Sequence, residues 1–400
     1  MNASVSPIPD DTADDATSVI DVTRRIKPAV QMALVARAAG RCQFRGCNEF
    51  LFEHPLTRAD GNFSEKAHIV AFKKRGPRGM DGDRPEDINA LSNLMLLCLR
   101  DHKLVDDNPA KYPRGELEEQ KAEHETRMAR LTALAPQMRS TVLTIKARIG
   151  SSLVEVGEHE VWQALYPRYP SERRPHVLDL TELGDEKAGA FYALAQERIH
   201  QLAGELYATG SDLRATGHLS VLGLAPMPLL ALLGSCLSNK VAVDFFQCHR
   251  TRPDRFTWYE EGDVVRFLTR KLRDGTAPGK SVLLLSLSGQ LGLGDVPSSI
   301  DTGSAVYEIT LDSMPPDLGF LRRREDLEAF RVIYRALLAS LRAESLGRTE
   351  LHLLPAAPAP VALACGYDLL PKVDPDLVLY DNIKPHGFIE RLKVRNHDRI

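Results

Sequence analysis

From about residue 160 to the C-terminus, continuous apolar runs alternate with segments that have helical spacing. The runs are HVLDL, LSVLGL, VAVDFFQ, SVLLLSLS, AVYEIT, TELHLLP and DLVLYD, and amphipathic stretches such as REDLEAFRVIYRALLASLRAE separate them. A strand that is apolar at every position must be covered on both faces, which is typical of a largely parallel sheet between helices. The sequence therefore predicts an α/β domain over residues 161–400. The order strand, helix, strand occurs once in each half, so we expect two related halves.

The region before this domain has a different composition. RRIKPAVQMALVARAAG and PRGELEEQKAEHETRMARLTALA have helical spacing, AHIVAF is typical of a short strand, and KKRGPRGMDGDRPED is rich in Gly, Pro and charge. These elements predict a small α+β domain at residues 24–140, followed by a linker at residues 141–160. The opening PDDTADDATSVID carries acidic residues and no basic ones, and we expect residues 1–23 to form a disordered acidic tail.

The overall composition excludes several classes of protein. Lys and Arg number 51 against 54 Asp and Glu, a net charge of −3, which argues against coating nucleic acid through bulk charge. No apolar stretch approaches the roughly 18 residues of a membrane span, so we expect no membrane partner. Without an export signal we expect a cytoplasmic location. Six cysteines are too few for a disulfide scaffold, and three of them share the first domain, which suggests a metal site there.

These cysteines have the spacing of metal ligands. Four residues separate Cys42 from Cys47, and two separate Cys98 from Asp101. One pair before and one pair after the glycine-rich loop could form a closed tetrahedral zinc site that stabilises a domain with little core of its own. The alternative is that Cys98, at the end of LMLLC, is an ordinary buried apolar residue.

Two histidines and an asparagine in the same region suggest a metal-dependent nuclease. Such an enzyme needs a base that takes a proton from water, beside a cation that neutralises charge on the phosphate. The near-neutral pKa of imidazole suits the base, which we expect to be His68. Asn93 and His102 would orient the base and hold the metal. Four basic residues of the intervening loop could contact phosphates, or could simply be solvated: Lys73, Lys74, Arg75 and Arg78.

The pieces CQFRGC, EKAHIV, LSNLMLLC, DHKLVDDNP and KAEHE resemble the HNH endonuclease family. This resemblance implies a ββα-metal fold with a catalytic divalent cation, which we expect to be Mg²⁺. It implies that His68 is the general base, that Asn93 fixes the strand and loop, and that His102 is a metal ligand.

The chain departs from the family pattern at two metal positions. Many HNH enzymes have an acidic ligand directly before the base, where this chain has Ala67. Glu65 is therefore the expected replacement ligand, with water as the alternative. Asp101 stands where the family often has Cys or His, and Asp106 could orient His102 from behind. Glu65 and Asp106 could equally be solvated carboxylates.

The C-terminal domain lacks the motifs of known catalytic or nucleotide-hydrolysing sites, which predicts a binding domain. In open α/β sheets ligands lie at the carboxyl ends of the strands, where this chain has APMP, CHRTRPDRFTW, SGQ and PAAPAP. Small residues allow close approach, Arg and Ser can meet phosphates, and Trp can stack, so a purine nucleotide would suit these loops. The alternative is ordinary turns with a core Trp. The candidate ligand-binding residues are Arg250, Arg252, Trp258, Ser288, Gln290, Pro355 and Ala356.

The segments VLGLAPMPLLALLGSCL, VAVDFFQCHR, VLLLSLSGQL and LHLLPAAPAPVALACGYDLLPKVDPDLVLYD resemble the SAVED domain, a fused pair of CARF-like Rossmann halves that senses cyclic oligonucleotides. HNH followed by SAVED is the architecture of effector nucleases in bacterial anti-phage (CBASS) signalling. The resemblance implies that a cyclic di- or trinucleotide binds, that the chains self-associate, and that double-stranded DNA is cut with little sequence preference.

Two other functions stay open from the sequence. One is a restriction-like HNH nuclease whose C-terminal domain reads DNA, although acidic stretches in that domain do not suggest a basic DNA-binding face. The other is a non-catalytic zinc module that only binds nucleic acid.

Overall fold

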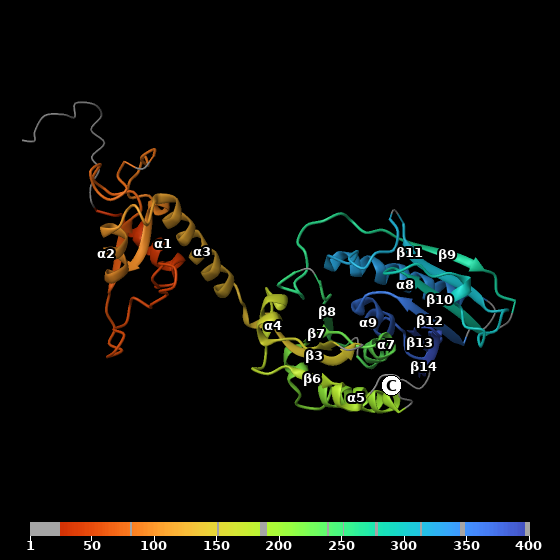
Figure 1. Cartoon of the computed structure of the whole chain (residues 1–400). Coiled ribbons are helices and arrows are strands. Elements are labelled where there is room, and N and C mark those ends of the chain that lie inside the picture. Colours follow the sequence, from red (N-terminus) through yellow and green to blue (C-terminus); the bar gives the residue numbers. More distant parts are fainter. Residues whose placement is uncertain are drawn as a thin grey trace, which may run out of the picture. The chain divides into compact units, whose positions relative to one another are not determined.

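The computed structural model divides into two compact units, Met1–Ala133 and Leu134–Ile400 (Figure 1). The expected N-terminal tail at residues 1–23 lies outside the part of the chain that the structure describes. The described residues are 25–80, 82–149, 152–184, 190–237, 240–250, 252–276, 279–312, 314–344 and 349–396.

The first unit contains two antiparallel strands followed directly by a helix. Its elements are α1 (Pro28–Arg37), β1 (Ser64–His68), η1 (Leu91–Asn93), β2 (Leu94–Cys98), α2 (Leu99–Asp107) and α3 (Arg114–Thr132). Ser64 pairs with Cys98 and His68 pairs with Leu94. The strand LMLLC is buried at every position and belongs to a small core that includes Leu34 of α1.

The second unit begins with a mixed sheet in the order β4-β3-β7-β8, where β5 and β6 also pair with β3. All of these pairs are parallel except β3 with β4. The elements are η2 (Pro136–Met138), β3 (Arg139–Ile149), β4 (Ser152–Val154), α4 (Glu158–Leu165), β5 (Tyr169–Pro170), β6 (His176–Asp179), η3 (Thr181–Leu183), α5 (Phe191–Leu206), α6 (Asp212–Thr216), β7 (His218–Gly223), α7 (Met227–Cys236) and β8 (Ala242–Phe245).

A second sheet follows in the order β14-β13-β12-β10-β11-β9, with its four central strands parallel and both outer strands antiparallel. The predicted α/β class is therefore confirmed for this region, although the sheets are mixed. The elements are β9 (Phe267–Arg273), β10 (Lys280–Ser286), η4 (Leu293–Asp295), β11 (Ala305–Leu311), α8 (Arg324–Ala343), β12 (Glu350–Ala356), α9 (Ala359–Tyr367), β13 (Asp376–Ile383) and β14 (Gly387–Val394).

The expected linker at residues 141–160 differs from the structure. These residues form most of β3, all of β4 and the start of α4, and β3 is an inner strand of its sheet. In RSTVLTIKARI, polar residues interrupt the apolar ones, so the segment does not resemble the continuous runs of the other parallel strands. Leu143 and Ile145 nevertheless lie fully buried in the main core.

Helices α7 and α9 lie between the two sheets and join the two halves (Figure 1). A Cβ atom on Gly234 would lie 2.0 Å from the carbonyl oxygen of Leu363, and one on Gly366 would lie 1.8 Å from that of Ala231. The two backbones therefore touch at these glycines, because any side chain would overlap the opposite helix.

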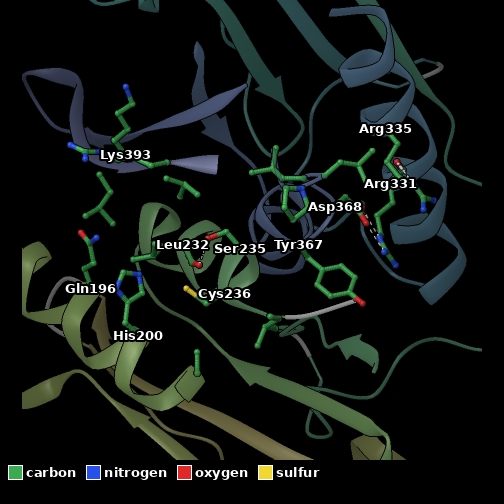
Figure 2. A pocket seen from close by; sticks show the side chains of 18 of the residues that line it. Gln196, His200, Leu232, Ser235, Cys236, Arg331, Arg335, Tyr367, Asp368 and Lys393 are labelled. Carbon is green, nitrogen blue, oxygen red and sulfur yellow. Dashed lines mark hydrogen bonds and ion pairs between the residues drawn. The ribbon is translucent and has the colours of Figure 1, made fainter. Parts of the chain in front are cut away.

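A cavity lies at each end of this helix pair. The first, of about 1100 Å³, adjoins the C-terminal ends of α7 and α9 (Figure 2), and we call it the basic cavity. The second, of about 650 Å³, adjoins their N-terminal ends, and we call it the strand-end cavity. Among the described residues, no helix is both long and apolar enough to span a membrane.

Candidate metal centre and ligand cavity

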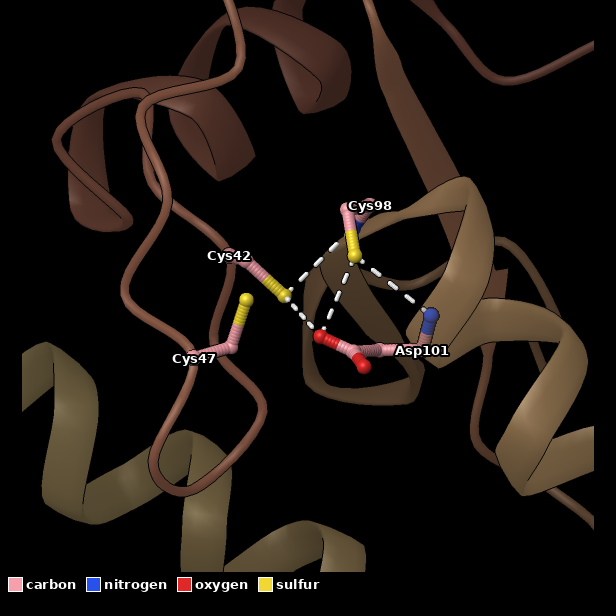
Figure 3. A group of neighbouring side chains, drawn as sticks. All are labelled: Cys42, Cys47, Cys98 and Asp101. Carbon is pink, nitrogen blue, oxygen red and sulfur yellow. Dashed lines mark hydrogen bonds between the residues drawn. The ribbon is translucent and has the colours of Figure 1, made fainter. Parts of the chain in front are cut away.

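Three cysteines and an aspartate come together in the first unit (Figure 3). Cys42 and Cys47 lie in the loop after α1, Cys98 ends β2, and Asp101 lies in the first turn of α2. Their ligand atoms all lie within 4.8 Å of one another. A tetrahedral zinc ion with Zn–S bonds of about 2.3 Å places its sulfur atoms about 3.8 Å apart. The spacing of these four side chains therefore fits one tetrahedral cation.

Hydrogen bonds and burial shape the chemistry of this cluster. The thiols of Cys42 and Cys98 donate to Oδ2 of Asp101 at 3.3 and 3.1 Å. Burial raises the pKa of the Cys42 thiol far above its usual value and raises the pKa of Cys98 to about 11. Burial also acts to raise the pKa of the Asp101 carboxyl, but hydrogen bonds from the three thiols lower it overall. Thiols so buried ionise only when a cation compensates the thiolate charge, which is how zinc displaces their protons.

Asn93 is buried and ties two segments of the first unit together. Its Oδ1 accepts the backbone N–H of Val70 at 2.9 Å, while its Nδ2 donates to the carbonyls of Val70 and Ile88 at 3.0 and 2.9 Å. Its own carbonyl accepts the backbone N–H of Ile69 at 2.8 Å. One side chain thus fixes the segment after β1 against the turn before β2, directly beside His68.

His68 is half-buried at the end of β1. Its Nε2 lies 2.9 Å from Oδ1 of Asn89, and its ring lies 6.3 Å from that of Phe72. With the amide oxygen of Asn89 as acceptor, Nε2 carries the proton and Nδ1 keeps a free lone pair. That tautomer leaves Nδ1 as the atom that can accept a proton.

His102 lies on α2 between two carboxylates. Its Nε2 is 3.3 Å from Asp106 and its Nδ1 is 3.9 Å from Glu65. The hydrogen bond with Asp106 raises the pKa of His102 above its usual value, against the effect of burial. For Asp106, burial acts to raise the carboxyl pKa, but bonds from His102 and Arg78 lower it overall. Glu65, His102 and Asp106 therefore form one cluster of two carboxylates and an imidazole. This cluster contains Glu65 and His102, the two predicted ligands of the catalytic cation.

The two histidines have different partners. Among the described residues, no hydrogen bond, ion pair or ring contact joins His68 to His102. The structure therefore brings His102 together with Glu65 and Asp106, and it brings His68 together with Asn89.

The basic loop divides into exposed and buried residues. Lys73, Lys74 and Arg75 are exposed, whereas Arg78 is buried. The guanidinium of Arg78 donates to the carbonyls of Ile69 and Val105 and to Asp106, each at 2.7 Å. The prediction that Arg78 contacts phosphates is therefore wrong, because this side chain is a buried crosslink with its donors in use.

The strand-end cavity in the second unit is lined by residues that follow β7, β8, β10 and β12, together with the end of β13. Of the predicted ligand-binding residues, Arg250 and Ser288 line it. Pro355 and Ala356 end β12, directly before the lining residues that begin at Ala357. The carbonyl of Ala356 accepts the backbone N–H of Ser288 at 2.7 Å, so Ala356 contacts a lining residue of the cavity.

The other predicted residues lie outside the lining. Arg252 lies over the ring of Tyr259 at 4.4 Å and pairs with Asp254, Trp258 packs against the core, and Gln290 donates to the buried Glu308 at 3.1 Å. Sequence reasoning missed several polar lining residues: Gln247, His249, Tyr259, Arg322, Asp381 and Asn382. The signal that could have found some of them is their position just after VAVDFF and within DLVLYDN, at strand ends.

His249 is the most unusual of these. Burial lowers its pKa to about 4, so its ring is neutral at pH 7. Its Nε2 is buried without a hydrogen-bond partner in the described part of the chain, and its ring meets those of Trp258 and Tyr259 edge-on at 6.0 and 5.1 Å. A neutral imidazole with a free nitrogen can exchange a hydrogen bond with an uncharged ligand group.

Comparison with solved structures gives only loose similarity. Two structures of an Acinetobacter baumannii Cap4 SAVED/CARF-domain containing receptor, with the cyclic trinucleotides 2'3'3'-cAAA and 3'3'3'-cAAA, are 13% and 12% identical to this chain, with TM-scores of 0.44. Each alignment covers 74% of this chain and 61% of the Cap4 chain. A third structure of that receptor is 14% identical with a TM-score of 0.41, covering 77% and 63%. This chain therefore spans less than two thirds of the solved chains.

No curated protein matches the chain. One protein family does: residues 202–394 match SAVED, described as the SMODS-associated and fused to various effectors sensor domain. The match covers slightly less than half of the chain and lies within the predicted 161–400 domain. Residues 202–394 are therefore similar to the SAVED family of sensor domains, as the sequence indicated.

Proposed function

We propose that this protein is a metal-dependent DNA endonuclease that a cyclic oligonucleotide activates, in CBASS-type anti-phage defence. The observation that carries the proposal is the match of residues 202–394 to a sensor domain described as fused to various effectors. The family is described as fused to effectors, and the first unit is the other compact part of this chain. The resemblance of this unit to HNH endonucleases supports a nuclease as the effector.

The cysteine cluster supports a structural zinc site in the nuclease unit. Cys42, Cys47, Cys98 and Asp101 would hold the ion with no open position, as structural zinc sites require. Because the two cysteine pairs come from separate segments, the ion would crosslink the loop after α1 to the junction of β2 and α2.

In the proposed reaction, His68 is the general base. Nδ1 takes the proton from an attacking water while Asn89 holds the opposite ring nitrogen, and Asn93 fixes the segment that follows. Glu65 and His102, with Asp106 beside them, would hold a divalent cation such as Mg²⁺. Such a cation stabilises the charge that develops on the phosphate and leaving oxygens. The exposed Lys73, Lys74 and Arg75 suit sequence-independent contacts with DNA phosphates.

The strand-end cavity is the proposed site for a cyclic di- or trinucleotide. Its volume of about 650 Å³ lies within the usual range of about 300–1,000 Å³ for small-molecule sites. Arg250 and Arg322 would face phosphates, Tyr259 offers a stacking face, and His249 offers a neutral hydrogen-bonding group to a base. The Cap4 receptors named above contain cyclic trinucleotides, which agrees with this class of ligand.

Activation requires that the ligand bind one state of the protein more tightly than the other. A nuclease without sequence preference must rest in an inactive state, and we propose that ligand binding favours a self-associated, active state. Binding to the strand-end cavity and assembly are then thermodynamically linked.

The test is plasmid cleavage by the purified full-length chain with Mg²⁺ and a panel of cyclic di- and trinucleotides. We expect one class of nucleotide to switch on cleavage, and His68→Ala to lower the rate by about 10²–10⁴-fold, the usual value of a general base. His54→Ala, which changes another histidine of the same unit, is the matched control and should cleave normally.

Each competing function predicts a different result. Cleavage that needs no nucleotide would favour the restriction-like enzyme and contradict gating. DNA binding without cleavage, unchanged in His68→Ala, would favour the zinc module and contradict the nuclease. Arg322→Ala should abolish activation and leave the zinc content of the protein unchanged.

A further inference from the structure

The basic cavity has a strongly one-sided charge. It adjoins the C-terminal ends of α7 and α9, at the opposite end of these helices from the strand-end cavity. Figure 2 shows Arg331, Arg335 and Asp368 on one side of it and Lys393 on the other. Six basic side chains line it against one carboxylate: Lys240, Arg331, Arg335, Arg391, Lys393 and Arg395, against Asp368.

Two of these cations are already neutralised. Arg331 donates to both carboxylate oxygens of Asp368, at 2.8 and 2.7 Å, and to Glu328 at 2.7 Å. Lys393 lies 2.6 Å from Glu350 and 3.5 Å from Asp376. These ion pairs account for Arg331 and Lys393 as parts of the fold.

Three arginines differ. No carboxylate of the described chain lies within ion-pair distance of Arg335, Arg391 or Arg395. The Nε of Arg391 is buried without a hydrogen-bond partner in the described residues, although its guanidinium lies over the ring of Tyr192 at 5.0 Å. The Nε of Arg335 donates to a backbone carbonyl at 3.2 Å, which leaves its charge uncompensated.

The helix ends do not cancel this charge. The C-terminus of an α-helix carries about half a negative charge, so α7 and α9 together offset about one of the three positive charges. A net positive potential remains in a concave site, where low-dielectric walls concentrate the field. Attraction to the helix C-termini therefore explains only part of the positive charge that lines this cavity.

We propose that the basic cavity is a second binding site, for an anion with several linked phosphate groups, either inorganic polyphosphate or the phosphate chain of a nucleotide. Guanidinium groups donate two parallel hydrogen bonds to phosphate oxygens, which suits Arg391 and Arg395 better than a lone ion would. Arg391 lies in β14 and Arg395 directly follows it, and both side chains line the cavity. A volume of about 1100 Å³ is far larger than one phosphate needs. This proposal does not depend on the nuclease or on its activating ligand.

The experiment is isothermal titration of the full-length protein with inorganic triphosphate, with ATP and with adenosine. We expect triphosphate and ATP to bind and adenosine not to bind. The double variant Arg391→Gln with Arg395→Gln should bind triphosphate about tenfold more weakly or worse, because it removes charge-assisted hydrogen bonds. Arg250→Gln, an equivalent change in the strand-end cavity, should bind triphosphate normally.

The single variant Arg395→Gln is expected to fold normally, because this exposed side chain makes no described contact. It should also weaken triphosphate binding, with the thermal unfolding temperature unchanged. The proposal fails if triphosphate does not bind, if adenosine binds as well as ATP, or if ATP binds and triphosphate does not. It also fails if the Arg391 and Arg395 variants leave affinity unchanged while Arg250→Gln lowers it, since the anion would then occupy the strand-end cavity.

Discussion

Replacing Gly366 by alanine tests the contact that joins the two halves of the second unit. The new Cβ would lie 1.8 Å from the carbonyl oxygen of Ala231 and 2.6 Å from the backbone nitrogen of Ser235, whereas ordinary contacts begin at 3.4 Å. Both atoms belong to the backbone of α7, so no side chain can turn aside. The helices must separate by about 1.5 Å, and over-packing of this kind costs about 3 kcal/mol or more.

The expected net effect follows from two opposing contributions. Alanine favours the helix over glycine by about 1 kcal/mol, so Gly366→Ala should destabilise the second unit by about 2 kcal/mol or more. For a domain of this size that lowers the unfolding temperature by about 4–8 °C. Gly204→Ala is the matched control, since this glycine of α5 is exposed and a Cβ there meets nothing within 4 Å.

Differential scanning calorimetry of the full-length protein measures both changes. Gly204→Ala should stabilise the second unit by up to about 1 kcal/mol. Its unfolding temperature should therefore rise slightly. If Gly366→Ala is as stable as the unchanged protein while Gly204→Ala behaves as expected, the backbones of α7 and α9 do not touch as described.

Three further predictions concern single side chains. Cys98→Ser should lower the bound zinc and the stability of the first unit, measured by metal analysis and circular dichroism; equal zinc in Cys98→Ser and the control Cys236→Ser would contradict the metal site. Asn93→Ala should cost about 3 kcal/mol in urea unfolding, because it leaves buried backbone groups unpaired, and an unchanged midpoint would refute its role. Burial lowers the pKa of His352 to about 4 from 6.5, so the unfolded chain binds a proton at this residue before the folded protein does. The free energy of unfolding should therefore fall by about 3 kcal/mol as the pH falls from 6.5 to 4. His352→Phe should flatten that loss, and an identical pH dependence of unfolding would count against it.

The sequence predicted those features that depend on residues close together in the chain, namely the buried strands and the paired metal-binding side chains. The apolar runs LSVLGL, SVLLLSLS and DLVLYD coincide with β7, β10 and β13, because a strand buried on both faces has to be apolar throughout. The spacing of Cys42, Cys47, Cys98 and Asp101 predicted two pairs of side chains with metal-binding atoms, and these atoms lie within 4.8 Å of one another. Such spacing is visible in a sequence because each pair lies in one turn or loop.

Other features depend on which distant segments become neighbours. β9 and β14 are antiparallel outer strands with exposed positions between apolar ones, so they lack the signature of the inner strands. Gln290 follows a strand, yet it bonds to Glu308 of the adjacent strand, a pairing that only the sheet order determines. Arg78 resembles its exposed basic neighbours in sequence, and only the position of α2 beside it makes it a buried crosslink.

The place of β3 sets practical limits on dividing this chain. α3 ends at Thr132 and β3 begins at Arg139, so few residues separate the last helix of one unit from an inner strand of the next. A fragment that started at residue 161 would lack the partner of β7, and the bare edge of that strand would invite aggregation. Expression of the second unit alone should therefore begin upstream of Arg139, so that β3 and all of its neighbouring strands are included.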